Sequence, residues 1–278
     1  MSDEVSIRDA LRVGPGAVDL SACDTAATPQ APGKKAKTLD DTQSMGPVLA
    51  GQQERLWAEG RRSMLLLLQG IDTAGKGGVV THVVGMLGPE GVKITAFKKP
   101  TAEEQAHHFL WRIRKASPPH GMVGVFDRSH YEDVLVPRVH KTMPEAQWRR
   151  RYGEINAFEA ELAAAGTTIV KCFLHISKAE SRDRLLARLD DPTKHWKFRE
   201  ADIDERAFWS DYQDAYAEML QECSTEHAPW YVVPSDHKWY RNWAVGQILR
   251  EVFDELDPQY PDADLDVPRL RERLRPPS

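Results

Sequence analysis

The segment 63–78 constrains the fold more than any other part of the sequence. It begins with SMLLLLQ (63–69), a continuous apolar run without polar alternation, and continues with the glycine-rich GIDTAGKGG (70–78). A run of this kind is typical of a strand that is covered on both faces, as in a parallel sheet. The residues after the loop, 76–87, are expected to form a helix that Gly88 ends. A strand, a glycine-rich turn and a helix in this order favour a layered α/β protein.

The rest of the chain repeats this alternation of strand and helix. We expect further strands at 92–97, 122–126, 167–176 and 230–234, and further helices at 43–60, 101–115, 144–166, 177–189 and 239–256. Thr101 with Glu104, and Ser177 with Glu180, have the spacing of capping boxes, which mark helix starts. The pattern predicts an α/β fold with a mainly parallel five-stranded sheet and helices on both faces.

Composition divides the chain into an arm, a main domain and a tail. Residues 1–42 are expected to form a partly irregular N-terminal arm, because residues 13–46 are rich in Gly, Pro, Ala, Thr, Asp and Lys and show no helical or strand period. The arm is either a plain tail or a segment that packs on a partner subunit. The main domain is expected at 43–260 and a C-terminal tail at 261–278. Within the main domain, 182–210 carries many basic residues and is expected to be a lid that closes over phosphates, or else an ordinary surface connection.

Charge and cysteine usage exclude several classes of protein. The chain has 37 basic and 42 acidic residues and a net charge of −5, which excludes a wholly basic, histone-like nucleic-acid binder. No nucleic-acid partner is expected. No apolar run approaches the roughly 18 residues of a membrane span, so no membrane association is expected. The 3 cysteines lie far apart and form no CxxC pair, which favours a reducing cytoplasm over a disulfide framework.

The loop after the first strand has the pattern G-x-x-x-x-G-K-G of a phosphate-binding P-loop, or Walker A motif. Backbone N–H groups of such a loop converge on phosphate oxygens, the helix N-terminus adds partial positive charge, and the lysine reaches the outer phosphates. Gly77 replaces the Ser or Thr that usually holds Mg²⁺, which makes Asp72 the candidate metal ligand. The alternative is a glycine-rich turn without a ligand. The residues expected to bind phosphate are Gly70, Thr73, Ala74, Gly75, Lys76, Gly77 and Gly78.

A second apolar strand, 122–126, is followed directly by Asp127 and Arg128. A carboxylate in this position is a Walker B arrangement, which places a second ligand for Mg²⁺ beside the P-loop. Arg128 offers paired N–H donors to a phosphoryl group in transfer, although it also suits a structural ion pair.

Three clusters of basic residues exceed what one nucleotide needs. Each cluster alone could be a solvated surface, but two of them follow predicted strands, where open α/β sheets bind ligands. A long polyanion would account for the excess. The clusters are Lys98 with Lys99; Arg138, His140 and Lys141; and Arg182, Arg184, Arg188, Lys194, Lys197 and Arg199.

Several segments together resemble polyphosphate kinase family 2 over residues from about 45 to 260. They are GIDTAGKGG (70–78), FKKPTAEE (97–104), HFLWR (108–112), FDRSHYEDVLVPRVH (126–140), DDPTKHWKF (190–198) and APWYVVPSDHKWYRNW (228–243). The resemblance implies a P-loop kinase fold with a helical lid, and Mg²⁺-dependent phosphoryl transfer between inorganic polyphosphate and a nucleoside mono- or diphosphate (AMP, ADP or GDP). It also implies Mn²⁺ as a substitute metal and a homo-oligomer, a dimer or tetramer.

The resemblance also assigns roles to residues. Asp72, Lys76, Asp127 and Arg128 take the catalytic roles, with Asp72 and Asp127 as metal ligands. Glu132 and Asp133 are assigned to the nucleotide site, and Arg138, Arg188, Lys194 and Lys197 join Lys98, Lys99 and Lys141 as polyphosphate or lid residues.

The preferred acceptor and two rival functions stay open. SHYEDVL and DPTKHWKF are most similar to the class III branch, which accepts AMP and ADP, but members of that branch often have Asn where this chain has Asp127. An ATP-dependent nucleoside monophosphate kinase and a non-catalytic polyphosphate- or nucleotide-binding module are the alternatives.

Overall fold

The protein was analysed as a computed structural model, which describes residues 5–14 and 16–275; residues 1–4, 15 and 276–278 of the expected arm and tail lie outside this part. The described residues form a five-stranded sheet of order β2-β3-β1-β4-β5, and every neighbouring pair is parallel. This confirms the predicted sheet, and each strand overlaps its predicted range. The strands are β1 Ser63–Gln69, β2 Val92–Ala96, β3 Val123–Asp127, β4 Thr167–His175 and β5 Trp230–Pro234.

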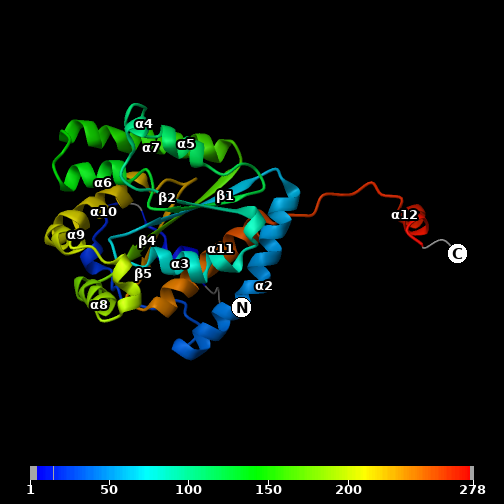
Figure 1. The fold of residues 1–278 in the computed structure, drawn as a ribbon, viewed down its shortest axis with the longest axis horizontal. Coiled ribbons are helices and arrows are strands. Elements are labelled where there is room, and N and C mark those ends of the chain that lie inside the picture. Colours follow the sequence, from blue (N-terminus) through cyan, green and yellow to red (C-terminus); the bar gives the residue numbers. More distant parts are fainter. Residues whose placement is uncertain (1–4, 15, 276–278) are drawn as a thin grey trace.

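Helices connect the strands and cover the sheet on both faces (Figure 1). The α-helices are α1 Ile7–Leu11, α2 Lys35–Glu59, α3 Lys76–His82, α4 Ala102–Gln105, α5 Trp111–Ala116, α6 Glu132–Val139, α7 Glu145–Ala164, α8 Lys178–Leu189, α9 Ala201–Glu205, α10 Trp209–Cys223, α11 Lys238–Leu256 and α12 Val267–Arg273. Short 3₁₀ segments are η1 Leu20–Ala22, η2 Val84–Met86, η3 Pro89–Gly91, η4 Pro192–Lys197 and η5 Arg206–Phe208.

Alternate residues of β1 divide the interior into two cores. Met64, Leu66 and Leu68 point into a core that α2, α3 and α11 cover. Leu65 and Leu67 point to the opposite face, into a core shared with α5, α7 and α10. Because successive side chains of a strand point to opposite faces, an unbroken apolar run is what a strand between two helical layers requires.

The first long helix begins earlier than the sequence indicated. It was expected at 43–60, but α2 starts at Lys35. Its first turns bury threonines instead of apolar residues: the hydroxyl of Thr38 donates to the backbone oxygen of Gly33, and that of Thr42 donates to Thr38. Hydrophobic periodicity detects only apolar helix faces. It therefore missed this buried face, whose hydroxyl groups form hydrogen bonds to nearby backbone oxygens.

The helix expected at 101–115 is wrong as a single element, and several other helices were not expected. The capping box of Thr101 and Glu104 is formed, yet α4 ends at Gln105 and α5 begins only at Trp111. The interruption turns Leu110 into the second core, where it is buried. Helices α6 and α10, both of which border the candidate site, were not predicted.

The N-terminal segment packs on its own chain. Ile7 and Leu11 of α1 are buried in the first core, and the backbone N–H of Val13 donates to Trp230 of β5. This contact covers one edge of the sheet. At the other end of the chain, α12 lies away from the rest of the molecule (Figure 1).

Within the residues that the structure describes, no helix combines the length and the apolar character needed to cross a lipid bilayer.

Leu66, in the middle of the central strand, provides a test of this architecture. Its side chain is fully buried, so Leu66→Ala should lower the free energy of unfolding by about 3 kcal/mol through lost burial and a residual cavity. Urea denaturation followed by circular dichroism measures the change. The control is Leu186→Ala on α8, where the side chain is 50% exposed and the expected loss is under about 0.5 kcal/mol. Equal losses in the two variants would contradict the assignment of β1 as the central strand.

Candidate functional site

Parallel pairing brings the predicted site segments to one edge of the sheet. Leu68 of β1 pairs with Asp127 of β3, and Asp127 also pairs with Ala96 of β2. The glycine-rich loop (residues 70–78), the segment after β2 and the segment after β3 therefore leave the sheet side by side. This is the edge at which open α/β sheets bind ligands.

The backbone of the glycine-rich loop favours glycine at two positions. Gly70 has φ of 149°, and a Cβ there would lie 2.7 Å from the backbone oxygen of Leu174. Gly75 has φ of 108°, and a Cβ there would lie 1.8 Å from Nη1 of Arg241. Both backbone conformations favour glycine, and at Gly70 the contact with a backbone oxygen does so as well, whereas at Gly75 the contact is with the end of the Arg241 side chain.

Lys76, the first residue of α3, folds back over the loop. Its Nζ donates to the backbone oxygen of Gly70 at 2.7 Å and to that of Ile71 at 3.4 Å. An ammonium group has three N–H donors, so one remains for a ligand. Burial and the charge of Arg128 lower the pKa of Lys76, while neighbouring carboxylates, Asp127 first, act in the opposite direction.

Asp72 stands among cations. Burial by itself would raise the pKa of its carboxyl group, but the charges of Lys76, Arg188 and Arg128 bring that pKa below its ordinary value. Oδ2 of Asp72 accepts from Nη1 of Arg188 at 3.3 Å. The side chain of Asp72 is therefore an ionised carboxylate at neutral pH and can bind a cation.

Arg128 adopts a backbone conformation that non-glycine residues rarely take, with φ of 64°. Its N–H donates to Leu68 at 3.1 Å, and its Nη1 donates to Oε2 of Glu132 at 3.2 Å. Oε1 of Glu132 in turn accepts from Nε2 of Gln69 at 2.5 Å. Strained residues persist where surrounding contacts fix them, commonly at functional sites. Glu132 raises the pKa of Arg128 above its usual value although burial opposes this, so the guanidinium stays charged.

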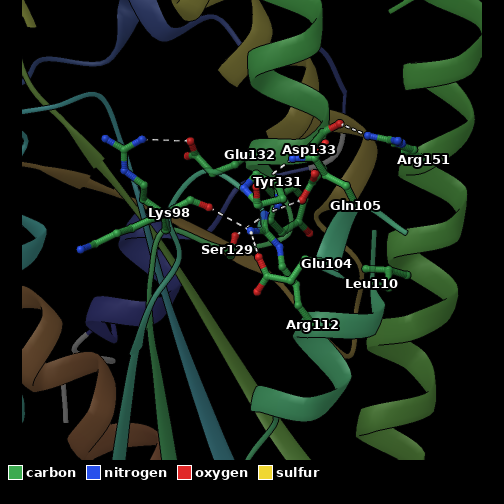
Figure 2. Close-up of polar contacts among 12 residues, drawn as sticks. Lys98, Glu104, Gln105, Leu110, Arg112, Ser129, Tyr131, Glu132, Asp133 and Arg151 are labelled. Atoms are coloured by element: carbon green, nitrogen blue, oxygen red, sulfur yellow. Dashed lines mark hydrogen bonds and ion pairs between the residues drawn. The ribbon is translucent and has the colours of Figure 1, made fainter. Parts of the chain in front are cut away.

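Arg112 joins the segments that follow β2 and β3 (Figure 2). Its Nη1 donates to the backbone oxygen of Lys98 at 2.9 Å and lies 3.7 Å from Oε2 of Glu104, while its Nη2 donates to Oδ2 of Asp133 at 3.0 Å. Burial raises the pKa of Asp133 above its usual value, and Arg112 limits that rise. Arg112 thus holds the Lys98 backbone against α6.

Two cavities open beside the glycine-rich loop. The first, here called the cationic cavity, has a volume of about 600 Å³. Among the described residues, the carboxylates in its wall are Asp72 and Asp127, and cations dominate: Lys76, Arg128, Arg184, Arg188, Lys194, Lys197, Arg199, Lys238 and Arg241.

The second, here called the mixed cavity, has a volume of about 550 Å³. Aromatic and apolar groups such as Phe97, Tyr212 and Tyr216 line it, together with basic and acidic side chains. Asp72, Thr73, Arg128 and Arg199 line both cavities. This shared wall is where ligands in the two cavities would meet.

The structure brings most of the predicted site residues together. In the cationic cavity lie Gly75, Lys76, Gly77, Gly78, Asp127, Arg188, Lys194 and Lys197; in the mixed cavity lie Gly70, Lys98, Lys99, Glu132 and Asp133; on the shared wall lie Asp72, Thr73 and Arg128.

Three predicted site residues line neither cavity. The Ala74 side chain is fully buried, and its backbone oxygen accepts from Arg184 at 3.0 Å. Arg138 pairs with Oε2 of Glu218 at 2.6 Å and packs over the ring of Trp148, which directs it to α7 and α10. Lys141 is exposed just beyond α6.

Sequence reasoning did not assign several residues that line the cavities. Tyr212 and Tyr216 lie on α10, a helix that was not predicted. Lys238 and Arg241 belong to the segment 228–243 that carried the family resemblance, but no chemical role was derived for them. Arg184 was noted only as one member of a basic cluster. Its Nη1 donates to Thr73 at 2.8 Å, so it holds the loop from behind.

A buried polar network supports the segment that carries Arg128. Nζ of Lys171 donates to Oε2 of Glu159 at 2.6 Å, to the hydroxyl of Tyr131 at 2.9 Å and to the backbone oxygen of Cys223 at 2.6 Å. Oε1 of Glu159 accepts from Tyr131 at 2.8 Å and lies 3.1 Å from Nε2 of His130. The network fixes His130 and Tyr131, and so the turn between β3 and α6, to β4, α7 and α10.

The donor set for a metal ion consists of two carboxylates. Asp72 and Asp127 line the same cavity. Among the described residues no group of three or more His, Cys, Asp or Glu side chains gathers in metal-binding geometry. Mg²⁺ is commonly bound by one or two carboxylates together with substrate phosphates and water, so this set fits Mg²⁺ bound along with a phosphate ligand.

Comparison with known proteins shows which family the sequence and the fold resemble. Residues 33–261 match the family described as Polyphosphate kinase 2 (PPK2). The chain is 44% identical over 254 residues to an AMP/ADP-polyphosphate phosphotransferase of Meiothermus ruber, covering 91% of this chain and 95% of that protein. It is 42% identical to an ADP-polyphosphate phosphotransferase of Rhodopseudomonas palustris, covering 81% of each chain. The crystal structure of Polyphosphate Kinase 2 from Arthrobacter aurescens TC1 superposes with a TM-score of 0.94 at 50% identity, covering 97% of this chain and 96% of that one.

The buried pair of Lys171 and Glu159 provides a stability test. Lys171→Met should lower the free energy of unfolding by about 3–5 kcal/mol, because it leaves the Glu159 carboxylate buried without its partner. The double variant Lys171→Met/Glu159→Leu should recover much of this loss. Removing Arg150, whose pair with Glu154 is largely exposed, should cost under about 1 kcal/mol. Chemical denaturation at pH 7 measures all three.

A pH series extends the same test. The pKa of Glu159 is lowered, because the charges of Lys171 and His130 outweigh the effect of burial. Stability from the ionised carboxylate is therefore fully present above the ordinary carboxyl pKa and is lost as the pH falls through the lowered value. A double variant that is no more stable than the single variant, or that keeps this acid dependence, would contradict the role of the pair.

Proposed function

Because this chain belongs to the polyphosphate kinase 2 family, we propose that it transfers the terminal phosphoryl group, reversibly, between inorganic polyphosphate and a nucleoside mono- or diphosphate. The observation that carries the proposal is the meeting of a cationic cavity and a mixed cavity at Asp72, Thr73, Arg128 and Arg199. Two phosphate-bearing ligands, one in each cavity, can face each other there.

Inorganic polyphosphate fits the cationic cavity. The chain carries negative charge along its length and has no apolar part, and the wall of this cavity is rich in Lys and Arg with few carboxylates. Without a polyanion these cations repel one another, so a bound polyphosphate would remove an unfavourable interaction. The glycine-rich loop acts here as a P-loop, and its backbone N–H groups and Lys76 bind the end of the chain.

The nucleotide fits the mixed cavity. Phe97, Tyr212 and Tyr216 offer surface against which a nucleoside can pack, while Lys98 and Lys99 line the same cavity for its phosphates. We propose AMP or ADP as acceptor, with GDP as a further candidate.

The reaction needs no protein nucleophile. An oxygen of the acceptor phosphate attacks the terminal phosphorus of the polyphosphate, forming one P–O bond. The P–O bond to the next phosphate breaks, and the shortened chain leaves with that oxygen. Arg128 on the shared wall neutralises charge on the phosphoryl group in transfer, and its fixed backbone keeps the guanidinium in place. The protein thus contributes orientation and charge.

Asp72 and Asp127 would hold Mg²⁺, with Mn²⁺ as the substitute, since both ions favour carboxylate oxygen. When bound, the ion neutralises charge on the reacting phosphates.

Residues 182–210 act as the lid in this proposal. They include most of α8, η4 and α9, which contribute residues to both cavities. Arg188 lies 3.3 Å from Asp72 of the loop and 3.8 Å from Asp202 of α9, so it links the lid to the loop. Closing over phosphates would exclude water and so prevent hydrolysis of the polyphosphate.

Location and assembly remain proposals. The 3 cysteines are unpaired in the structure, which suits the cytoplasm that we propose. We also retain the dimer or tetramer that the family resemblance implies, and propose no nucleic-acid partner.

Loss of either of two residues should abolish transfer without unfolding the protein. Lys76→Ala removes the cation of the loop, and Asp127→Ala removes a carboxylate of the cationic cavity. Each should reduce kcat/KM by about 10³-fold or more, because only positioned charges stabilise the transition state. Lys178→Ala is the control, since Lys178 is exposed and lines neither cavity. Near-normal turnover by either variant, with its folding confirmed by thermal melting, would refute the assigned role.

A donor–acceptor matrix tests the activity itself. AMP, ADP, GMP and GDP are mixed separately with long-chain polyphosphate and Mg²⁺, and chromatography separates the products. The same acceptors are then supplied with ATP as the sole donor. We expect transfer from polyphosphate to AMP or ADP. Transfer to AMP from ATP alone would indicate a nucleoside monophosphate kinase, and binding without turnover would indicate a non-catalytic module.

A further inference from the structure

Arg184 lines the cationic cavity, but its guanidinium is occupied by the protein itself. The side chain lies on α8 and is 8% exposed, and its Nε donates to Oε1 of Glu180 at 2.7 Å. Its Nη1 donates to the backbone oxygens of Thr73 and Ala74 at 2.8 and 3.0 Å. Its Nη2 donates to two backbone oxygens in the turn between β5 and α11. A guanidinium has five N–H donors, and each of them here has an acceptor in the chain. Arg184 is therefore placed to hold the loop and not to bind a ligand.

The contact with Arg184 holds a strained part of the loop. Thr73 has φ of 71°, a value that is rare for a residue branched at Cβ. Such strain persists only where surrounding contacts fix the backbone. Here Arg184 binds the backbone oxygen of Thr73, and the Thr73 hydroxyl donates to Oγ of Ser181, also on α8, at 3.0 Å. Because Thr73 lines both cavities, α8 fixes the loop at the wall where two ligands would meet.

The turn between β5 and α11 holds Arg184 from the other side. Nη2 of Arg184 donates to the backbone oxygen of Ser235 at 2.5 Å and to that of Asp236 at 3.1 Å. Ser235 is fully buried, and its N–H donates to the backbone oxygen of His175 at the end of β4 at 2.8 Å. Oδ1 of Asp236 accepts from the N–H of Ser177, the N-cap residue of α8, at 2.8 Å. The position of Asp236 thus affects both the guanidinium and the helix that carries it.

A segment of the N-terminal arm, residues 16–31, fastens this turn and is here called the strap. The hydroxyl of Thr25 donates to Oδ2 of Asp236 at 2.7 Å, and the N–H of Asp236 donates to the backbone oxygen of Thr25 at 3.1 Å. At a second point, on α11, the hydroxyl of Tyr240 donates to the backbone oxygen of Pro29 at 2.9 Å. The strap therefore reaches the loop through Asp236 and Arg184, and it holds α11 separately through Tyr240.

We propose that the strap is a positioning element of the candidate site. Thr25 fixes Asp236, and the turn that carries Asp236 orients Arg184. Arg184 in turn keeps Thr73 in its strained conformation. The inference rests on the proposed function and deepens it, because phosphoryl transfer would depend on a segment that lines neither cavity. The family match begins at residue 33, so family membership by itself assigns the strap no role. Because small displacements of positioned groups slow a reaction strongly, a loosened strap should act mainly on kcat.

Thr25→Val is the central test, because valine keeps the shape of the side chain and removes the hydroxyl. We expect kcat for transfer from long-chain polyphosphate to fall about tenfold, while the KM for the nucleotide stays within about twofold. Thr25→Ser, which restores a hydroxyl, should recover most of the loss. Tyr240→Phe is the matched control, since it also removes one hydrogen bond between the strap and the rest of the protein. Both Thr25→Val and Tyr240→Phe should lower the Tm by about 2–4 °C, but only Thr25→Val should slow transfer.

A double-mutant cycle tests whether the strap acts through Arg184. Arg184→Lys keeps a positive charge at the cavity, but an ammonium group lacks the planar fork that joins the loop to the turn. Its kcat should fall at least as far as that of Thr25→Val. In this background Thr25→Val should lower kcat by less than about a further twofold, because substitutions within one network are not additive. A near-normal kcat of Arg184→Lys, or a fully additive loss in the double variant, would contradict the proposal.

The outcomes separate this inference from the proposed function. If the wild type transfers phosphoryl groups from polyphosphate but Thr25→Val matches Tyr240→Phe in kcat, the inference is overturned and the proposed function stands. If the wild type shows no transfer, the proposed function fails, and hydrogen exchange of the free protein still tests the strap. Thr25→Val should then speed exchange of the backbone amides in residues 70–83, and Tyr240→Phe should not. Equal exchange of this segment in the two variants would overturn the inference.

Discussion

The parallel pairing of β1 with β3 is the constraint from which the site follows. Leu68 lies in register with Asp127, so the loop that begins at Gly70 and the segment that begins at Arg128 leave the sheet together. Because parallel strands need crossover connections, helices must cover both faces, and this explains why residues 64–68 of β1 are apolar without interruption. The sheet thus fixes the positions of the two backbone segments that follow β1 and β3, and their side chains meet at this edge of the sheet.

Two kinds of buried charge occur in this protein, and they differ in how they are balanced. Beneath the site, Lys171 and Glu159 are both buried and pair directly, and further hydrogen bonds satisfy the pair. At the site, Lys76 and Arg241 are also buried, but their acceptors are backbone oxygens and, for Arg241, an amide oxygen. The first arrangement supports the fold. The second leaves buried positive charge that forms no salt bridge among the described residues.

Sequence reasoning predicted the strands well and the site in part, for identifiable reasons. β1, β3 and β5 are mostly apolar runs, β2 and β4 are rich in β-branched residues, and the glycine-rich loop has a spacing that few other structures require. The start of α2 was missed because its buried face carries Thr38 and Thr42, and the break before α5 depends on burial of Leu110 in the tertiary structure. In the sequence, Arg138 could not be distinguished from the other basic residues of its cluster. The fold shows that it pairs with Glu218. Residues far apart in sequence, such as Arg241 and Gly75, are brought together by packing that no local pattern encodes.

The contrast between the two cavities bears on why the donor and the acceptor do not exchange places. A polyphosphate chain has no apolar surface with which to cover Phe97, Tyr212 and Tyr216, and in the mixed cavity it would meet the carboxylates of Glu132, Asp133, Asp202 and Glu205. A nucleoside in the cationic cavity would instead leave most of the cations there without a partner. Each ligand thus loses favourable contacts and gains unfavourable ones in the wrong cavity, which is how discrimination arises from differences in affinity. In the proposed reaction, orientation at the shared wall follows from where each ligand is stable, and Arg128, fixed by its backbone and by Glu132, would stand between them.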